Sequence, residues 1–295
     1  MELLLRIAQV IVPVFFVVGV GYAYGRRAQP DLGAFNRIVL DVMTPLLVYT
    51  GLANRDFHLR EHLPLIGAAA LLVLGTGVLA WLLARGTRTS PRTLVPVVMF
   101  NNSGNMGLPL ALLAFGASQF GAAVALFSVS CLLHFSLGAR ITSARASTRE
   151  LLLSPLMVSS ALGFASAATG VRPPEMLMTG MRLLGEPMLP LMLLSLGVRL
   201  TQLRRADVAP GLLGAFARPL LGLVLALPLA WLFDLDAAAR GQLVLFAALP
   251  PAVMQFMLAE RYGQEPGRVA AMILLGNALA VAFVPLALAI ALPGP

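Results

Sequence analysis

The sequence of 295 residues contains no lysine and only one cysteine, Cys131. A single cysteine excludes a disulfide within the chain and any cysteine-based metal site. Histidine is also scarce, and His58 and His62, which we place in a loop, lack a glutamate at the position that the zinc-binding HExxH motif requires. The sequence therefore predicts no metal site and no catalytic residues.

Charged residues make up only 12% of the chain, whereas about 25% is usual for soluble domains. Hydrophobic residues make up 59%, and the mean hydropathy is +0.87. A soluble protein of this length could not bury so much apolar surface. The net charge of +8 would suggest nucleic acid in a soluble protein, but here the arginines lie between apolar runs. We therefore expect an integral membrane protein that binds the lipid bilayer and no nucleic acid.

Ten apolar runs have about the length that a bilayer requires, roughly 20 residues. They cover residues 7–24, 36–53, 63–84, 94–115, 120–138, 151–170, 178–198, 211–233, 241–260 and 269–291. The first run is too long for a signal peptide and lacks a cleavage site, so we expect it to be retained. Within it, Gly21 and Gly25 are four residues apart, which allows another helix to approach closely.

The arginines are concentrated in every second loop. The odd-numbered loops contain Arg26, Arg27, Arg37, Arg85, Arg88, Arg92, Arg140, Arg145, Arg149, Arg199, Arg204, Arg205, Arg261 and Arg268, whereas the even-numbered loops contain Arg55, Arg60, Arg172, Arg182 and Arg240. Arginine-rich loops face the cytoplasm. The pattern predicts a multi-pass protein of the cytoplasmic (inner) membrane with both termini outside.

The fourth run contains three asparagines, a serine, two glycines and a proline near its middle, in the sequence FNNSGNMGLP of residues 100–109. Unpaired backbone groups cost several kcal/mol in hydrocarbon, so irregular backbone survives there only against protein or a water-filled cavity. We interpret this stretch as a helix broken in mid-membrane at Gly104, Gly107 and Pro109. Broken helices of this kind mark the binding sites of secondary transporters.

The two halves of the chain match weakly at an offset near 145–150 residues. Residues 41–47 match 186–192, residues 79–82 match 229–232, and residues 101–109 match 250–255. Five spans per half would invert the second half relative to the first. We therefore expect a first repeat at 1–139, a cytoplasmic linker at 140–150 and an inverted repeat at 151–295. Pro250 and Pro251 predict a second broken helix, because each proline removes a backbone donor.

With these motifs the chain resembles the auxin efflux carrier family, which includes bacterial organic-anion permeases. The resemblance rests on 101–109 and 249–263, with support from 19–22 and 41–52, and it extends over essentially the whole chain. It implies an all-α fold of ten transmembrane helices in two inverted five-helix repeats, with helices four and nine broken and crossed, as in the NhaA and bile-acid-symporter type. It further implies a scaffold of spans 1, 2, 6 and 7, a transport domain of spans 3–5 and 8–10, an elevator-type cycle and a homodimer. The long cytoplasmic loop of the plant exporters is absent, which leaves auxin open as the substrate.

Each break places a helix N-terminus at the membrane centre, where unpaired N–H groups and the helix dipole favour an anion. Two such ends suit a carboxylate. The side chains expected to contact it are Asn101, Asn102, Ser103, Asn105 and Gln255. The alternative is that the asparagines only cap the broken backbone.

Three ionisable residues lie within the spans, where a charge is costly and therefore a functional candidate. Asp41 and Glu186 each lie four residues before a proline and are candidates for proton or sodium coupling. The alternatives are that they lie nearer a membrane face, or that they form a structural pair with an arginine such as Arg182. Arg218 could bind a substrate carboxylate, pair with one of these acids, or extend to the interface. His134 and Asn277 are more often packing residues than ligands.

The sequence favours a secondary transporter of small organic anions, such as malate, malonate or auxin-like acids, with no cofactor apart from a coupling H⁺ or Na⁺. A sodium-coupled bile-acid-type symporter is the nearer alternative. An intramembrane enzyme acting on lipid or isoprenoid is more distant, because we find neither its acidic motifs nor a histidine cluster. The absence of a P-loop argues against direct use of ATP.

Overall fold

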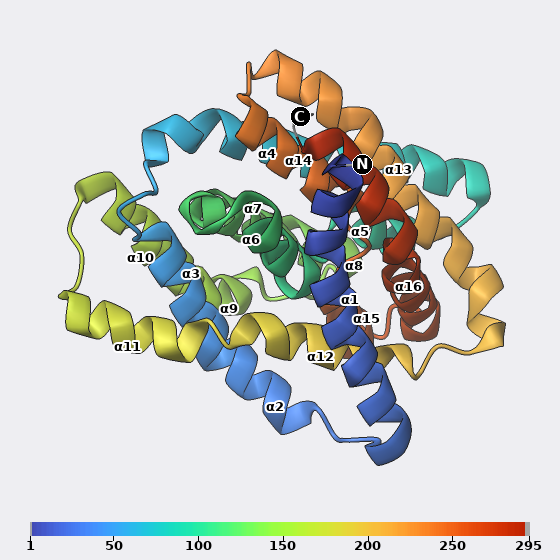
Figure 1. Ribbon diagram of the computed structural model, residues 1–295. Coiled ribbons are helices and arrows are strands. Elements are labelled where there is room, and N and C mark those ends of the chain that lie inside the picture. Colours follow the sequence, from blue (N-terminus) through green and yellow to red (C-terminus); the bar gives the residue numbers. More distant parts are fainter. Residues whose placement is uncertain (1, 293–295) are drawn as a thin grey trace.

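The computed structural model describes residues 2–292 and consists of helices joined by short connections, with no strand among the described residues (Figure 1). Six helical runs are long and apolar enough to cross a membrane, and three shorter helices are also apolar. Large apolar side chains such as Phe16 and Trp231 are exposed, as expected where lipid replaces water. The chain is therefore a multi-pass membrane protein. The outermost limits of the predicted repeats, residues 1 and 293–295, lie outside the described residues.

Each predicted apolar run is helical, although the number of membrane crossings stays a prediction. The α-helices are α1 (Glu2–Ala28), α2 (Gly33–Ile38), α3 (Thr44–Leu52), α4 (Leu59–Thr87), α5 (Pro91–Met99), α6 (Leu108–Phe115), α7 (Phe120–Leu133), α8 (Ala139–Thr142), α9 (Thr148–Leu152), α10 (Pro155–Thr169), α11 (Glu175–Gly185), α12 (Met188–Leu200), α13 (Val208–Leu232), α14 (Ala237–Ala248), α15 (Met254–Tyr262) and α16 (Pro266–Ala291). Single π-helical turns are η1 (Val39–Met43), η2 (Ser103–Gly107) and η4 (His134–Gly138), and 3₁₀ turns are η3 (Ala117–Gln119) and η5 (Arg205–Asp207).

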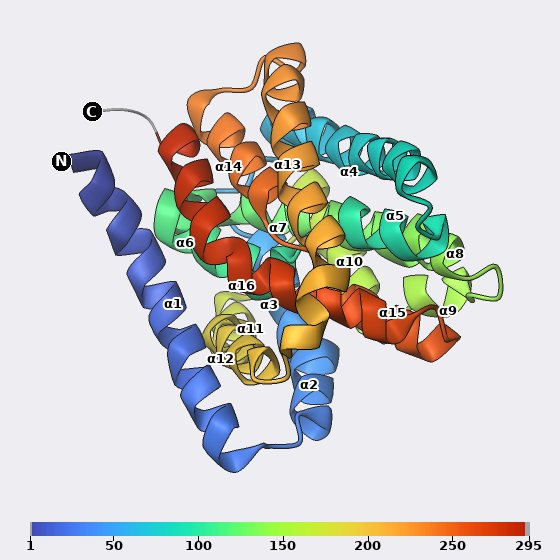
Figure 2. The ribbon, with the colours of Figure 1, turned by 90° about the vertical axis from the view of Figure 1, so that its right-hand side faces the viewer.

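The helices pack in two groups. In the first, α1 lies along α12, while α3 contacts α10 and α11. In the second, α13 contacts α4, α14 and α16, and α4 contacts α5 and α7. Figure 2 shows α1, α11 and α12 toward the lower left, α2 at the bottom, α13 at the top, and α4 and α5 toward the upper right. The groups meet where α3 contacts α7 and where α1 contacts α6 and α16.

Glycines bring α1 and α12 into backbone contact. A Cβ atom at Gly21 would lie 2.1 Å from the carbonyl oxygen of Leu194, and one at Gly197 would lie 2.1 Å from that of Val18. No side chain fits in either place. The prediction that Gly21 allows another helix to approach is confirmed, and α12 is that helix.

Asp41 and Glu186 both lie where a helix is irregular. Asp41 lies in the π-turn η1, and Glu186 lies between α11 and α12. Each residue lies four positions before a proline, Pro45 or Pro190, whose ring clashes with the carbonyl of the fourth preceding residue. The proline spacing thus accounts for the local irregularity in both places.

Candidate functional site

The first helix break begins earlier than the sequence suggested. Helix α5 ends at Met99, the backbone is extended at Phe100, and a helical course resumes as η2 and α6. Gly104 and Gly107 therefore lie in the resumed π-turn, and Pro109 lies in the first turn of α6. The predicted break is present, but residues 100–102 form it.

The two glycines of η2 are needed for close packing. A Cβ atom at Gly104 would lie 2.9 Å from the ring of Phe127, and one at Gly107 would lie 2.7 Å from the side chain of Leu249. The second contact joins the resumed helix to the other break. The glycines thus act through packing after the break.

The second break separates α14 from α15 and pairs with the first. Asn101 and Pro251 form an isolated antiparallel bridge. The N–H of Asn102 donates to the carbonyl of Pro250 across 2.8 Å, and the N–H of Ala252 donates to that of Phe100 across 3.0 Å. Pro250 and Pro251 have no backbone N–H groups, so neither proline needs a hydrogen-bond acceptor here. The two breaks satisfy part of each other's backbone in a place where water is excluded.

Two asparagine side chains hold this pairing in place. The Asn101 amide donates to the carbonyl of Phe246 across 2.6 Å, and the Asn102 amide donates to Oδ1 of Asn277, also across 2.6 Å. Asn277 in turn donates to the carbonyls of Pro251 (3.2 Å) and Ile273 (2.9 Å). The Nδ2 groups of Asn101 and Asn102 thus bond to protein, as in the capping alternative, whereas Oδ1 of Asn101 is buried without a partner among the described residues. Asn277, an isolated amide in an apolar run, joins the breaks to α16, a role that sequence reasoning missed.

Gln255 is fully buried and bonds within the protein. Its amide donates to Oγ1 of Thr142 across 3.0 Å, and its Oε1 lies 2.9 Å from Nε2 of His134. It does not line the cavity at the breaks, whereas His134 does. The predicted contact of Gln255 with substrate stays a prediction, and in this structure both ends of its amide bond to protein.

Ser103 and Asn105 have free polar groups. Both side chains line a cavity at the breaks and have no hydrogen-bond partner among the described residues. The backbone N–H groups of residues 103–105, 253 and 254 likewise donate to no described residue. These groups belong to the beginnings of η2 and α15, where helices leave N–H groups unpaired. Residues with unpaired N–H groups from both breaks therefore line the cavity.

This cavity, the crossover cavity, has a volume of about 40 Å³ and is lined by residues of both breaks together with Thr44, Phe127, His134 and Met192. A cavity needs roughly 10–15 Å³ of such volume to hold one water, so this cavity has room for a few waters. A hollow of about 440 Å³ shares Leu40 and Met254 with it and includes Asp41; we call it the Asp41 hollow.

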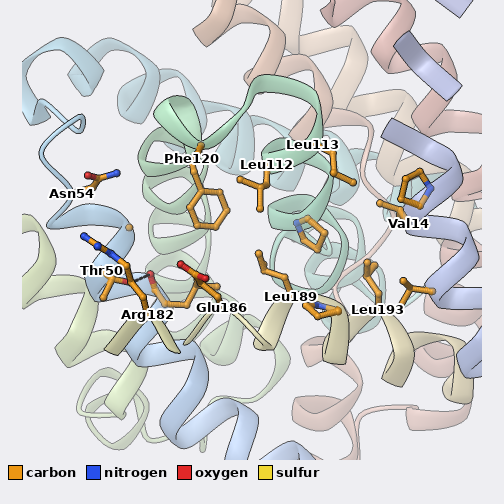
Figure 3. A pocket seen from close by; sticks show the side chains of 17 residues that line it. Val14, Thr50, Asn54, Leu112, Leu113, Phe120, Arg182, Glu186, Leu189 and Leu193 are labelled. Atoms are coloured by element: carbon orange, nitrogen blue, oxygen red, sulfur yellow. Dashed lines mark hydrogen bonds between the residues drawn. The ribbon is translucent and has the colours of Figure 1, made fainter. Parts of the chain in front are cut away.

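Another hollow, of about 430 Å³, lies among α1, α3, α6 and α12, and we call it the Glu186 hollow. Figure 3 shows that Thr50, Arg182 and Glu186 form its polar end and that Val14 and Leu193 lie toward its apolar end. Arg182 is paired with Glu175 across 2.8 Å. Asp41 and Glu186 are both exposed, and neither has an ion pair among the described residues. The structural pair with Arg182 is thus not formed.

Arg218 is fully buried on α13 and lies against the end of α14. Its guanidinium donates to the carbonyls of Ala247 (3.2 Å) and Phe246 (3.4 Å), and Nε has no partner among the described residues. Cations are favourable at helix C-termini because the dipole is negative there. Neither Asp41 nor Glu186 is a partner of Arg218, and burial excludes extension to the interface. Its described contacts stabilise the end of the broken helix, and it is not among the residues that line the crossover cavity.

The histidines near the start of α4 do not form a metal site. His62 lies within α4 rather than in a loop, and its Nδ1 is 2.8 Å from the carbonyl oxygen of His58. Among residues 2–292 no group of three histidine, cysteine or acidic side chains could hold a metal ion.

Comparisons with known proteins point to a family of transporters. A family model described as membrane transport protein matches residues 7–148 and 139–288. An uncharacterized transporter of Methanothermobacter thermautotrophicus is 25% identical over 294 residues, which cover 94% of this chain and 96% of the relative. A protein of Rhizobium meliloti named "putative malonate transporter" is 25% identical over 309 residues, covering 95% and 94%. An uncharacterized transporter of Methanocaldococcus jannaschii is 23% identical over 274 residues, covering 86% and 88%. All these names are those of transporters, in agreement with the prediction that the chain is not an enzyme.

Proposed function

This chain belongs to the membrane transport protein family, the auxin efflux carrier-like group, and on that premise we propose that it is a secondary transporter of small organic anions. The observation that supports the substrate class is the crossover cavity. Five of the residues that line it, from two helix beginnings, have unpaired backbone N–H groups, and the side chains of Ser103 and Asn105 are free. Such N-termini favour negative charge, and converging donors suit a carboxylate.

The proposed substrates are acids with one or two carboxylates, and malonate is the first to test. One relative of similar length is named for malonate. The donor groups lie in two sets, residues 103–105 on η2 and residues 253–254 before α15. A small dicarboxylate can accept hydrogen bonds from both sets at once, which favours it over a larger acid with a single carboxylate.

The proposed architecture is the ten-span inverted repeat, with the chain in the inner membrane and both termini outside. We assign α1, α2–α3, α10 and α11–α12 to a scaffold that forms a homodimer, and α4–α8 with α13–α16 to a moving transport domain. The packing of the helices in two groups supports this division. The arginine-rich loops support the orientation.

The proposed cycle is of the elevator type. The crossover cavity, at about 40 Å³, is far smaller than the two hollows beside it, so we expect the site to widen when an anion enters. The Asp41 hollow and the Glu186 hollow each have room for such an anion, at about 440 and 430 Å³. Movement of the transport domain along the scaffold would join the crossover cavity to one hollow and then to the other. Asp41 and Glu186 would then lie on the two routes, where they are placed to bind a coupling cation.

A thermal-shift panel on the purified protein tests the proposed function. Malonate, malate and an aromatic monocarboxylate are added with sodium or with potassium, at pH 5.5 and 7.5. We expect malonate to raise the melting temperature of the wild type and of Asn36→Ala on α2, but not of Asn105→Ala, because a ligand that binds only the folded state stabilises it. A cooperative melt that no acid shifts would contradict anion binding. A sodium-dependent shift would favour the bile-acid-type symporter.

A further inference from the structure

A chain of hydrogen bonds determines which nitrogen of His134 bears the proton. The hydroxyl of Thr142 donates to the carbonyl of Gly138 across 2.9 Å, so its oxygen accepts from the amide of Gln255 across 3.0 Å. This orients Oε1 of Gln255 toward Nε2 of His134 at 2.9 Å. Because Oε1 can only accept, Nε2 carries the hydrogen, and a neutral imidazole then has its lone pair on Nδ1.

The ring that carries this lone pair lines the crossover cavity. His134 stacks on Phe100, with ring centroids 4.1 Å apart and planes 4° from parallel. Nδ1 of His134 has no hydrogen-bond partner among the described residues. It is also not one of the unpaired polar atoms there that are fully enclosed by protein, so a small molecule can reach it. Nδ1 is the one basic nitrogen on the cavity wall in the described part of the chain. A wall of free N–H donors thus contains a single basic acceptor.

No other charge competes for this position. The other titratable side chain on the cavity wall is the buried Cys131. Helices α5, α8, α9 and α15 contact η4 or bond to His134, and their charged side chains are all exposed and outside the cavity wall: Arg92, Arg140, Arg149, Glu150, Glu260 and Arg261. Glu150 is already paired with Arg261 across 3.1 Å. Among the described residues that line the cavity, His134 is therefore the one base, and the carboxylate of Asp41 lies in the adjoining hollow.

We infer that His134 is the residue at which a proton joins the transported anion. A fully ionised dicarboxylate would place its carboxylate oxygens against the lone pair of Nδ1. The oxygens and Nδ1 are all hydrogen-bond acceptors, so this contact is unfavourable. The singly protonated acid instead donates its O–H to Nδ1, while its carboxylate accepts from the N–H groups of the two breaks. No covalent bond changes except the O–H that forms when the dianion takes up H⁺ on one side and breaks when it releases H⁺ on the other. One proton thus accompanies each anion.

The inference rests on the proposed function, and proteoliposomes can test the two separately. Wild-type protein is reconstituted around a trapped pH dye, and uptake of radiolabelled malonate and internal acidification are measured together. We expect about one proton per malonate, with uptake at fixed total malonate falling about tenfold per pH unit above the second ionisation of the acid. Protein-free liposomes and the Asn105→Ala variant correct for diffusion of the free acid.

The decisive variant is His134→Gln, which retains a donor for Gln255 but removes the base. Its control is His62→Gln, which changes a half-buried histidine outside the cavity and is expected to behave as the wild type. We expect the His134→Gln variant to transport malonate at least tenfold more slowly, with fewer than about 0.3 protons per anion. A ratio of one in this variant, or a wild-type ratio near zero with protein-dependent uptake, would overturn the inference and leave the proposed function intact. Absence of protein-dependent uptake or binding of any acid would overturn the proposed function itself.

A second measurement serves if His134→Gln does not fold. The chain has three histidines, so changing His58 and His62 to Gln leaves His134 as the only imidazole. Nitrogen-15 NMR of this protein reports the tautomer directly. We expect hydrogen on Nε2 without malonate and a large shift of the Nδ1 resonance with it. Hydrogen on Nδ1 in the free protein, or an Nδ1 resonance that malonate leaves unchanged, would exclude the proton-sharing contact.

Discussion

The side-chain amide of Asn102 donates to the side-chain oxygen of Asn277 across 2.6 Å. This bond joins the first helix break to α16, and Asn277 continues it to the carbonyl of Pro251 in the second break. Both asparagines are buried. One residue on an uninterrupted helix thus holds two interrupted helices together, and the cavity with its free N–H groups depends on that arrangement.

We expect Asn277→Leu to destabilise the protein by about 1–3 kcal/mol for each polar group left buried without a partner. Leucine has the same branched shape and number of side-chain heavy atoms as asparagine, but it leaves the amide of Asn102 and the carbonyl of Pro251 unpaired. Unfolding in mixed detergent micelles measures the loss. The exposed Thr169→Ala should change little, and an Asn277→Leu protein as stable as the wild type would show that the bond is dispensable.

Gly21 and Gly19 provide a matched pair on α1. We expect Gly21→Ala to cost about 1–3 kcal/mol, because its Cβ would force α12 away from α1. At Gly19 the space within 4 Å is empty, so Gly19→Ala should cost nothing. Melting curves of the two variants test this prediction. Equal melting temperatures would mean that α1 and α12 can move apart without a loss of stability.

Asn101 and Arg218 should be energetically coupled, because both donate to the carbonyl of Phe246. In either single variant, Asn101→Ala or Arg218→Leu, the other donor remains. We expect the double variant to lose about 0.5–3 kcal/mol more than the sum of the single losses. A cycle of unfolding measurements tests this, with Asn101→Ala and Thr169→Ala as the pair expected to be additive. Additivity for Asn101 and Arg218 would show that the shared carbonyl carries no coupling.

The predicted orientation can be tested with single cysteines, because Cys131 is buried and the only native one. In a Cys131→Ala background, a reagent that cannot cross the membrane should label Ser118→Cys in intact cells, because that turn is expected outside. Ala144→Cys, in the arginine-rich linker, should react only after the cells are opened. Labelling in the opposite order would invert the topology.

The part of the candidate site that depends on residues adjacent in the sequence was predictable. Three asparagines and a serine in an apolar run, and two successive prolines, mark the breaks because these residues either lack a backbone donor or compete with the helix for hydrogen bonds. Which of them remain free for a ligand was not predictable. The amides of Asn101 and Asn102 are engaged, whereas the side chains of Ser103 and Asn105 are not. His134 and Asn277 resembled packing residues because their partners lie far away in the sequence.

The sequence by itself determined the class of protein, the places of the helices and the places where two of them break. Each of these follows from composition or from neighbouring residues, since apolar length sets a membrane helix and proline interrupts one. Only the tertiary structure decided that the breaks pair with each other, that Arg218 lies at the end of α14, and that the His134 ring lines the cavity. These depend on contacts such as the one between Asn102 and Asn277, which are 175 positions apart. Such contacts arise when helices pack, and no local pattern encodes them.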